Sequence, residues 1–210
     1  MDHLGAILDR LAHAPQADAA RLRRLILDAA RRLYFAHGAD GVSARKIASA
    51  VGVSPTAIYL HFRGIDDLLH ALRMEGHGKL AEYLRSVDPK LPALARLAAM
   101  GRAYHRFGLE NRHYYELMFL IRSADAPRRE AVQQELFTLM LLRDAVAAGI
   151  AAGEIRDDLD PLIVTSALWA KVHGVTSLAV SGLMTQATIE EQETVLAAVF
   201  DAITAWLTPR

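Results

Sequence analysis

The chain has 210 residues, no cysteine, and 24 basic against 24 acidic side chains, so its formal net charge is zero. The lack of cysteine excludes disulfides, thiol redox sensing and cysteine-based metal sites. Alanine and leucine dominate, glycine and proline are sparse, and no uninterrupted run reaches the about 20 apolar residues of a membrane span, which predicts an all-α protein outside the membrane.

The first 19 residues are expected to form an N-terminal arm. Four apolar residues recur in it at helical spacing: Leu4, Ile7, Leu8 and Leu11. Pro15 is predicted to end this short helix, because proline removes a backbone donor and obstructs the preceding turn. The segment lacks the basic region of a secretory signal, so we expect the protein to be cytoplasmic.

A DNA-binding domain is predicted at residues 20–66, with a helix-turn-helix at about residues 44–63. Its first helix should run from about Ala20 to His37. The apolar face of this helix is Leu22, Leu25, Ile26, Ala29 and Leu33. Gly38 follows, and glycine readily takes the left-handed conformation that ends many helices.

Two short helices follow in close succession. Ser43 is placed to cap a helix over residues 44–50. After a turn at Gly52, Ser54 is placed to cap a second helix over residues 55–61. Two helices joined in this way indicate a helix-turn-helix. Six apolar residues are expected to face the first helix: Ile47, Ala48, Val51, Val53, Ile58 and Phe62.

The second of these helices has the side chains of a DNA-reading helix. The N-terminal part of such a helix lies nearest the bases in the major groove. Pro55, Thr56 and Ala57 are therefore expected closest to base edges, where small side chains permit a deep approach. Tyr59 and His61 suit phosphate oxygens, although Tyr59 could instead pack in the core and His61 could simply end the helix.

Basic residues are concentrated in this part of the chain. Between Arg21 and Arg73 there are nine basic and four acidic side chains, although the whole chain is neutral. Such a block indicates an anionic partner, while a solvated surface would give the same asymmetry. Arg45 and Lys46 could reach base edges or phosphates, or could remain solvated.

The segment LILDAARRLYFAHGADGVSARKIASAVGVSPTAIYLHFRGIDDLLHAL closely resembles the N-terminal domain of the TetR family of bacterial transcriptional repressors. The resemblance covers roughly Arg21 to Leu80 and rests on linked elements, above all IASAVGVS and IYLHF followed by DDLL. It implies a double-stranded DNA operator contacted by Ser43, Arg45, Lys46, Ser54, Pro55, Thr56, Ala57, Tyr59 and His61. Ile65 stands where the family often has a lysine near a phosphate, and Arg63 is expected to replace that contact.

Residues 67–210 are expected, from the same resemblance, to form a helical ligand-binding and dimerisation domain, giving about nine helices in all. Six helices are read from the apolar periodicity: residues 65–87, 92–111, 113–122, 128–152, 161–181 and 189–207. The stretch LWAKVHGVTSLAVSG resembles a C-terminal subtype marked by Trp169, His173 and Gly174. Trp169 and His173 are four residues apart and so share a helix face.

An unusual density of aromatic residues in this domain predicts an apolar pocket for a small hydrophobic effector. Its expected lining is Tyr104, His105, Phe107, Tyr114, Met118, Phe137, Met140, Trp169 and His173. Plain core packing would explain the same residues. His105, His113 and His173 lie on separate segments without ligand spacing, so neither a metal nor another cofactor is predicted.

The last two helices are predicted to pair with their copies in a homodimer, as a four-helix bundle. The apolar residues assigned to this face are Leu162, Ile163, Leu168, Val172, Val175, Val195, Leu196, Val199, Phe200, Ile203 and Trp206. A two-fold dimer would read a roughly palindromic operator. An effector that prefers another arrangement of the dimer would draw it off DNA, with the helix at 65–87 as the lever.

Two other interpretations stay open. A regulator without a small ligand would use the C-terminal domain only for dimerisation or for a protein partner. A helical enzyme could use His105, His173 and a carboxylate such as Glu110, although the sequence contains no nucleophile elbow, phosphate loop or metal motif.

Overall fold

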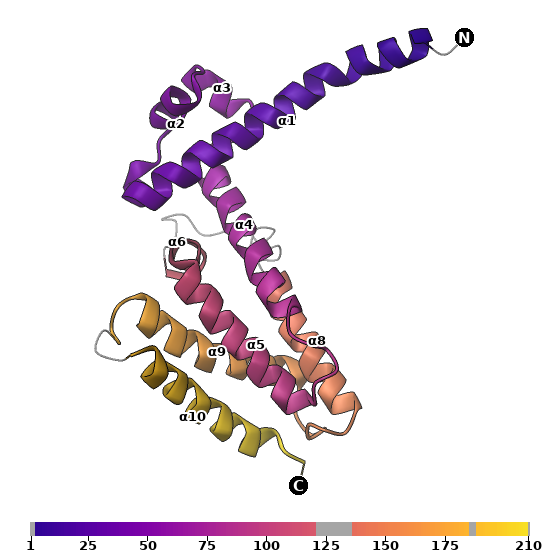
Figure 1. Cartoon of the computed structure of the whole chain (residues 1–210), viewed down its shortest axis with the longest axis vertical. Helices are drawn as coiled ribbons and strands as arrows, with labels where there is room; N and C mark the ends of the chain where they lie inside the picture. Colours follow the sequence, from indigo (N-terminus) through magenta and orange to yellow (C-terminus); the bar gives the residue numbers. More distant parts are fainter. Residues whose placement is uncertain (1–2, 121–135, 185–187, 210) are drawn as a thin grey trace. The chain divides into compact units, whose positions relative to one another are not determined.

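The computed structural model describes residues 3–120, 136–184 and 188–209. Within these ranges the protein has nine α-helices and no β-strand, which confirms the all-α fold (Figure 1). Backbone packing divides the chain into two compact units, Met1–Leu72 and Arg73–Arg210. The functional domain limits at residues 20 and 67 stay a prediction.

The first unit begins with α1 (His3–His37). A short 3₁₀-helix, η1 (Ala39–Gly41), leads to α2 (Ala44–Val51) and α3 (Pro55–Tyr59). α4 (Ile65–Arg85) begins in this unit and ends in the second. α1 packs on α2, and α2 packs on α3, so the helix-turn-helix rests on the long first helix as the sequence indicated.

The helix predicted to end at Pro15 continues through it. α1 is a single helix of 35 residues from His3 to His37, so the break at Pro15 and the helix start near Ala20 are wrong. An interior proline costs a helix about 3 kcal/mol. The flanking sequences are rich in alanine, leucine and arginine, which favour the helix most strongly, and their summed preference outweighs the single proline.

The core of the first unit lies under the helix-turn-helix. Ile47, Ala48, Ile58 and Phe62 are buried as predicted, and Val51 and Val53 are half-buried. On α1, Ile26 and Ala29 are buried as predicted, together with Ala30 and Tyr34, whereas Leu25, predicted on this face, is 44% exposed. Leu25 lies one residue, about 100° around the helix, from Ile26.

The second unit is built around one central helix. Its elements after α4 are α5 (Ala93–Glu110), α6 (Arg112–Tyr115), the π-helix η2 (Glu116–Leu120), α8 (Phe137–Ala151), α9 (Pro161–Val180) and α10 (Ile189–Leu207). α5 packs against α8, α9 and α10 (Figure 1). The single helix predicted at 113–122 is instead α6 followed by η2, and residues 121–122 and 128–135 of the predicted helices lie outside the described residues.

Two glycines allow α5 to approach its neighbours closely. A Cβ atom at Gly108 would lie 2.4 Å from Cγ2 of Thr176 on α9. A Cβ atom at Gly101 would lie 2.0 Å from Cζ of Phe200 on α10. Both separations are far below van der Waals contact, so a larger residue at either position would push the helices apart.

α9 passes a length and composition test for a membrane span, and it is the one helix in the described ranges that does. Its packing is that of a core helix, because it contacts α5, α8 and α10. Val164, Leu168 and Val172 are buried in these contacts.

Most of the apolar residues assigned to a dimer face are buried within the protomer's own core. These are Leu168, Val172, Val175, Leu196, Phe200 and Ile203. Val199 and Trp206 are half-buried. Leu162, Ile163 and Val195 are exposed, as are Leu178 and Leu183, which the sequence had not assigned to this face. α9 carries one lysine or acidic side chain, Lys171, among mostly apolar residues, so its sequence pattern did not separate the side that faces the core from the outer side.

Candidate DNA-binding surface and effector site

Local hydrogen bonds fix the helix-turn-helix in the way that its sequence predicts. Oγ of Ser43 accepts the backbone N–H of Lys46, and Oγ of Ser54 accepts that of Ala57, each at 3.3 Å. Gly52 has a φ of 81° at the turn, in the left-handed region that favours glycine. Both helices therefore start at defined residues, and the start of α3 is held in place.

The residues predicted to contact DNA lie on the outside of the first unit. Arg45, Lys46, Ser54, Pro55, Thr56, Tyr59 and Arg63 are exposed, and Ser43, Ala57 and His61 are half-buried. Tyr59 is 55% exposed and so does not belong to the core. His61 lies two residues beyond the end of α3, not on the helix. That these residues touch DNA stays a prediction.

Backbone contacts hold the turns on either side of this surface. The N–H of Arg63 donates to Oδ2 of Asp67 at 3.0 Å, which fixes the start of α4. Nζ of Lys46 lies 3.4 Å from the main-chain oxygen of Asp40, to which it donates. Ile65, where the resemblance led us to expect a lysine, is half-buried.

Sequence reasoning missed Leu60, which follows Tyr59 on this surface. Its side chain is 80% exposed, more than any other large apolar residue in the described part of the first unit. Leucine is a core residue by type, so only the structure reveals its position. An exposed apolar side chain here is a further candidate for contact with a thymine methyl group.

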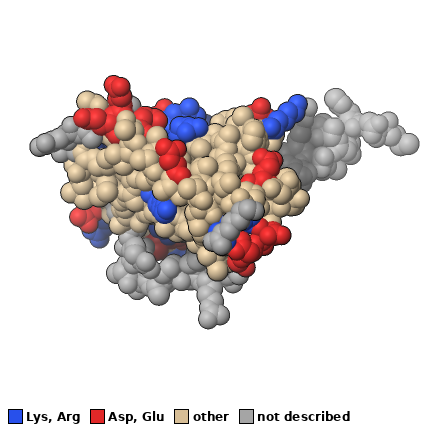
Figure 2. All heavy atoms as spheres, turned by 90° about the horizontal axis from the view of Figure 1, so that it is seen from below, with Lys and Arg blue, Asp and Glu red and all other residues tan. Residues whose placement is uncertain are grey.

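The basic excess of the first unit is partly compensated. Arg31 forms an ion pair with Asp28 at 2.7 Å. The face drawn in Figure 2, where acidic and basic side chains lie interspersed among uncharged residues, is not a view of the helix-turn-helix. Because the formal net charge of the whole chain is zero, the candidate DNA contacts depend on particular side chains such as Arg45 and Lys46.

A second group of residues comes together inside the second unit. Tyr104, Tyr115, Phe119, Trp169 and His173, here named the aromatic cluster, come from α5, α6, η2 and α9. The ring centroids of Phe119 and Trp169 both lie 5.3 Å from that of His173. The Tyr115 ring stacks on His173 at 5.7 Å. Of these five residues, Tyr104, Trp169 and His173 were among the predicted pocket residues.

Two tyrosine hydroxyls converge on one imidazole nitrogen. The hydroxyl oxygens of Tyr104 and Tyr115 lie 2.9 Å and 2.8 Å from Nδ1 of His173. Burial lowers the pKa of His173 and raises the pKa of both tyrosines. All three groups are therefore uncharged near neutral pH, and the cluster combines apolar rings with an uncharged hydrogen-bonding centre.

The aromatic cluster continues towards α4 and α8 through His77. The His77 ring is buried, with its centroid 5.9 Å from that of Phe119 and 6.0 Å from that of Phe137. Its Nδ1 lies 3.1 Å from Oγ1 of Thr138. Phe137, which was predicted to line the pocket, thus lies next to His77, a histidine outside the predicted set, and not against the cluster residues themselves in the contacts described.

Four other predicted pocket residues pack elsewhere in the unit. The hydroxyl of Tyr114 donates to Oε1 of Glu75 at 2.6 Å. Met118 lies against α4, with its sulfur 2.6 Å from where a Cβ of Gly76 would be. Phe107 packs edge-on against Tyr83 at 5.6 Å. Met140 is half-buried on α8.

His105 also lies apart, between α5 and α9. Its Nδ1 is 3.1 Å from Oγ1 of Thr176, whose hydroxyl donates to the main-chain oxygen of Val172 at 2.8 Å. Because the Thr176 hydroxyl donates its proton to Val172, it can only accept from His105, which therefore donates from Nδ1. The other ring nitrogen, Nε2, is then a buried acceptor without a hydrogen-bond partner among the described atoms. Burial lowers the pKa of His105, although Glu193 acts in the opposite sense.

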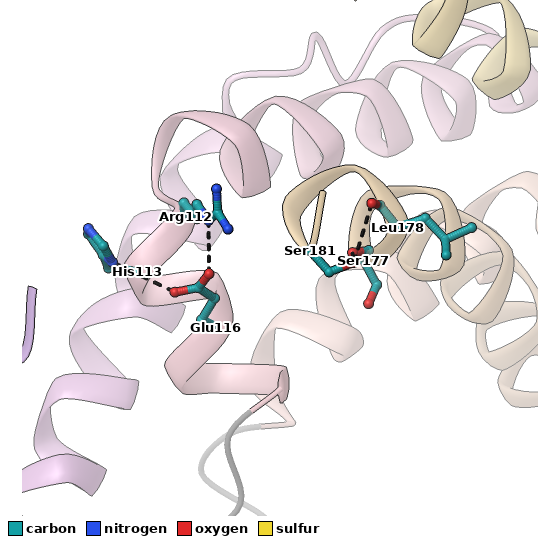
Figure 3. Close-up of polar contacts among 6 residues, drawn as sticks. All are labelled: Arg112, His113, Glu116, Ser177, Leu178 and Ser181. Atoms are coloured by element: carbon teal, nitrogen blue, oxygen red, sulfur yellow. Dashed lines mark hydrogen bonds and ion pairs between the residues drawn. The ribbon is translucent and has the colours of Figure 1, made fainter. Parts of the chain in front are cut away.

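The junction between α6 and η2 is braced by charged side chains. Glu116 lies 2.9 Å from Nε of Arg112 and 3.7 Å from Nδ1 of His113 (Figure 3). At the end of α9, the Ser181 hydroxyl donates to the main-chain oxygen of Ser177 at 2.7 Å (Figure 3). η2 carries Phe119 into the aromatic cluster, and short π-helices are frequent at functional sites.

Among the side chains that the structure describes, no three histidine, aspartate or glutamate residues come together in a way that could hold a metal ion. His105 bonds to Thr176 and His173 bonds to two tyrosines, while His113 lies beside Glu116. The three histidines therefore take part in three separate contacts.

Comparisons with known proteins match the two halves of the chain separately. Residues 26–72 match the family described as bacterial regulatory proteins, tetR family. Residues 97–203 match the tetracyclin repressor-like C-terminal domain. The Trp-His-Gly subtype stays a prediction.

Individual proteins resemble the chain over part or most of its length. The HTH-type transcriptional repressor Rv1474c of Mycobacterium tuberculosis is 44% identical over 62 residues, which are 30% of this chain and 33% of that protein. A protein of unknown function from Rhodococcus sp. RHA1 has a similar structure, with a TM-score of 0.76 and 30% identity over 89% of this chain and 95% of that one. The regulator FadR from Bacillus subtilis, solved in complex with stearoyl-CoA, has a TM-score of 0.67 at 20% identity, covering 87% of this chain and 97% of that one.

Proposed function

The chain belongs to the TetR family of bacterial regulatory proteins, and we propose that it is a repressor that a small hydrophobic effector releases from DNA. The observation that carries the proposal is the start of α3. Ser54, Pro55 and Thr56 are exposed there, above the buried Ile58 and Phe62. A regulator of this kind acts on the bacterial chromosome and so in the cytoplasm.

DNA recognition is assigned to the exposed surface of α2 and α3. Pro55, Thr56 and Ala57 face base edges, since the start of the second helix enters deepest into the major groove. Tyr59, His61 and the basic side chains contact phosphates and set the register. The full set is Ser43, Arg45, Lys46, Ser54, Pro55, Thr56, Ala57, Tyr59, His61 and Arg63.

Homodimerisation is assigned to the outer side of α9 and α10. Ile163, Leu178 and Val195 are 64%, 46% and 41% exposed there. Gly174 lies on the same outer side of α9, and a Cβ at this glycine would meet no atom within 4 Å. Burying such a face against its copy would give a two-fold dimer, whose recognition helices reach successive major grooves about 34–36 Å apart.

Effector binding is assigned to the second unit around the aromatic cluster. The cluster offers apolar rings together with a few uncharged polar groups, which is the lining typical of sites for small hydrophobic ligands. We assign the site on this ground, and a domain that only dimerises remains the alternative. The complex of FadR with stearoyl-CoA supports the same assignment, since it places a hydrophobic ligand in a protein of similar fold.

The proposed DNA binding is tested by fluorescence anisotropy. The protein is titrated onto the DNA upstream of its own gene and onto a scrambled duplex, over a series of salt concentrations. We expect tight binding to the first duplex only, weakening steeply with salt. Thr56→Ala should weaken binding to the upstream DNA and leave binding to the scrambled duplex unchanged, whereas equal weak binding of the wild type to both duplexes would contradict the proposal.

The proposed dimer is tested by sedimentation of two matched leucine variants. Leu178 on α9 is 46% exposed, and Leu91, which precedes α5, is 38% exposed. Leu178→Glu should yield a monomer, because it places a charge in the apolar face, while Leu91→Glu should stay dimeric. A monomeric wild type, or a dimer that survives Leu178→Glu, would argue against this face.

A further inference from the structure

The exposed side of α3 carries methyl groups and hydroxyls. The helix has the sequence PTAIY, and Leu60 follows at its C-terminal end with helical backbone angles, φ −72° and ψ −22°. Thr56, Tyr59 and Leu60 are exposed, whereas Ile58 is buried. Thr56 and Leu60 are four residues apart, so their side chains lie next to each other on one helix face. The methyl group of Thr56 and the isobutyl group of Leu60 therefore form one small apolar surface.

The residue types of α3 limit which bases the helix can read. Guanine is read mainly by arginine or lysine at O6 and N7, and adenine by asparagine or glutamine at N6 and N7. Neither α3 nor Leu60 provides any of these four residue types, and the basic side chains Arg45, Lys46 and Arg63 lie before or after the helix. The Thr56 hydroxyl can bond to several base edges and so discriminates little. In the major groove the apolar group of a base pair is the C5-methyl group of thymine, which Thr56 and Leu60 match.

Leu60 differs from an ordinary exposed leucine in its place on the molecule. A single exposed apolar side chain is common and marks no contact by itself. Leu60, however, is 80% exposed next to Thr56, within residues 26–72, which match the tetR family. A phosphate would lose hydration against this side chain and gain no hydrogen bond from it. A thymine methyl group would instead remove apolar area from water on both sides, so the surface favours a methylated base edge over the DNA backbone.

We propose that α3 identifies the operator through thymine methyl groups, which Thr56 and Leu60 contact in the major groove of each half-site. The inference rests on the proposed function, because it names the bases that the same DNA-binding surface takes. Each half-site then has A·T pairs opposite α3, while Tyr59 and the basic side chains hold the phosphates on either side.

Uracil tests this inference, because it differs from thymine only by lacking the C5-methyl group. Fluorescence anisotropy compares the DNA upstream of the gene, and a scrambled duplex, with copies in which every thymine is replaced by uracil. One methyl contact is worth about fourfold in affinity, and the proposed dimer makes the contact in both half-sites. We therefore expect the uracil form of the upstream duplex to bind about fifteenfold more weakly, and the two scrambled forms to bind alike. An upstream duplex with 7-deazaguanine, which lacks the N7 acceptor of guanine, should lose less affinity than the uracil form.

Variants assign the preference for thymine to the two side chains. Thr56→Ser keeps the hydroxyl and removes the methyl group, and Leu60→Ala removes the isobutyl group. The double variant should bind the thymine and uracil forms of the upstream duplex equally, and both positions are exposed, so its melting curve should match that of the wild type. Leu91→Ala is the matched control, because Leu91 is 38% exposed in the second unit, and it should keep the preference.

The unmodified duplexes separate this inference from the proposed function. Tight binding to the upstream duplex alone, with no loss on uracil substitution, would overturn the methyl readout and leave the DNA-binding regulator standing. A larger loss with 7-deazaguanine than with uracil, or a thymine preference that survives in the double variant, would also overturn it. Equal weak binding to both unmodified duplexes would refute the proposed function, and this inference with it.

Discussion

The contact between α5 and α9 gives a prediction that can be worked out from the structure. Gly108→Ala places a Cβ 2.4 Å from Cγ2 of Thr176. Thr176 cannot easily move away, because its hydroxyl donates to Val172 and bonds to His105. Overpacking of this kind lowers the free energy of unfolding by about 1–3 kcal/mol, while replacing a helical glycine by alanine raises it by about 1 kcal/mol. The net effect of Gly108→Ala is therefore a decrease in the free energy of unfolding of up to about 2 kcal/mol.

Gly174→Ala is the matched control on the neighbouring helix. A Cβ at Gly174 would meet no atom within 4 Å in the protomer, so Gly174→Ala has no overpacking cost. Its higher helix propensity should raise the free energy of unfolding by about 1 kcal/mol. The gain in helix propensity cancels when the two variants are compared. Gly108→Ala should therefore be less stable than Gly174→Ala by about 1–3 kcal/mol, the overpacking cost alone.

Urea unfolding followed by circular dichroism measures this difference. Several protein concentrations are needed, because a dimer interface at Gly174 would make the apparent stability depend on concentration. If the two variants have equal stability at every concentration, then α5 and α9 do not approach as closely as the structure places them.

Three further predictions concern the caps, the basic residues and the buried histidines. Ser54→Ala removes the cap of α3 and should destabilise the first unit by about 1 kcal/mol in urea unfolding; an unchanged midpoint would show that the cap is dispensable. Arg45→Ala and Lys46→Ala should each lower the slope of log K against log salt by about 0.9 if the side chain neutralises a phosphate, and an unchanged slope would exclude that contact. Burial holds the pKa of His105 and His173 in the folded protein below the ordinary value of 6.5. The free energy of unfolding should therefore be highest above pH 6.5 and should decrease as the pH falls from 6.5 towards the pKa values in the folded protein, because the unfolded chain then binds more protons. Unfolding at about pH 5.5 and 7.5 should show this loss in the wild type and less of it in His173→Gln; an identical pH dependence would refute the burial argument.

The helix-turn-helix could be predicted because its signals are local. Ser43 and Ser54 each cap the helix that follows them, and Gly52 adopts the left-handed turn that its residue type favours. Each of these interactions spans three or four residues, so the sequence contains both partners side by side. α1 continues through Pro15 because the summed helix preference of the flanking residues outweighs the cost of one proline, which a rule for single residues does not capture.

The aromatic cluster shows the opposite case. Tyr104 and His173 are 69 residues apart, and Tyr115 and His173 are 58 apart, yet they share one nitrogen atom. Apolar periodicity shows which side of a helix is buried but not which residue of another helix it meets. The prediction grouped Tyr104 with His173, which the structure brings into contact, but it also included Phe107 and Tyr114, which pack against α4.

The π-helix explains why Phe119 could not be placed from the sequence. A regular helix continued from α6 would put each residue about 100° from the last, and the wider π-turn of Glu116–Leu120 changes that register. Phe119 then contacts Tyr115, four residues earlier, and also Trp169 and His173 on α9. The same residue touches His77 on α4, so a ligand that displaces Phe119 would act on both α9 and α4. Under the proposed effector response, the irregular turn would therefore connect the cluster with His77 on α4.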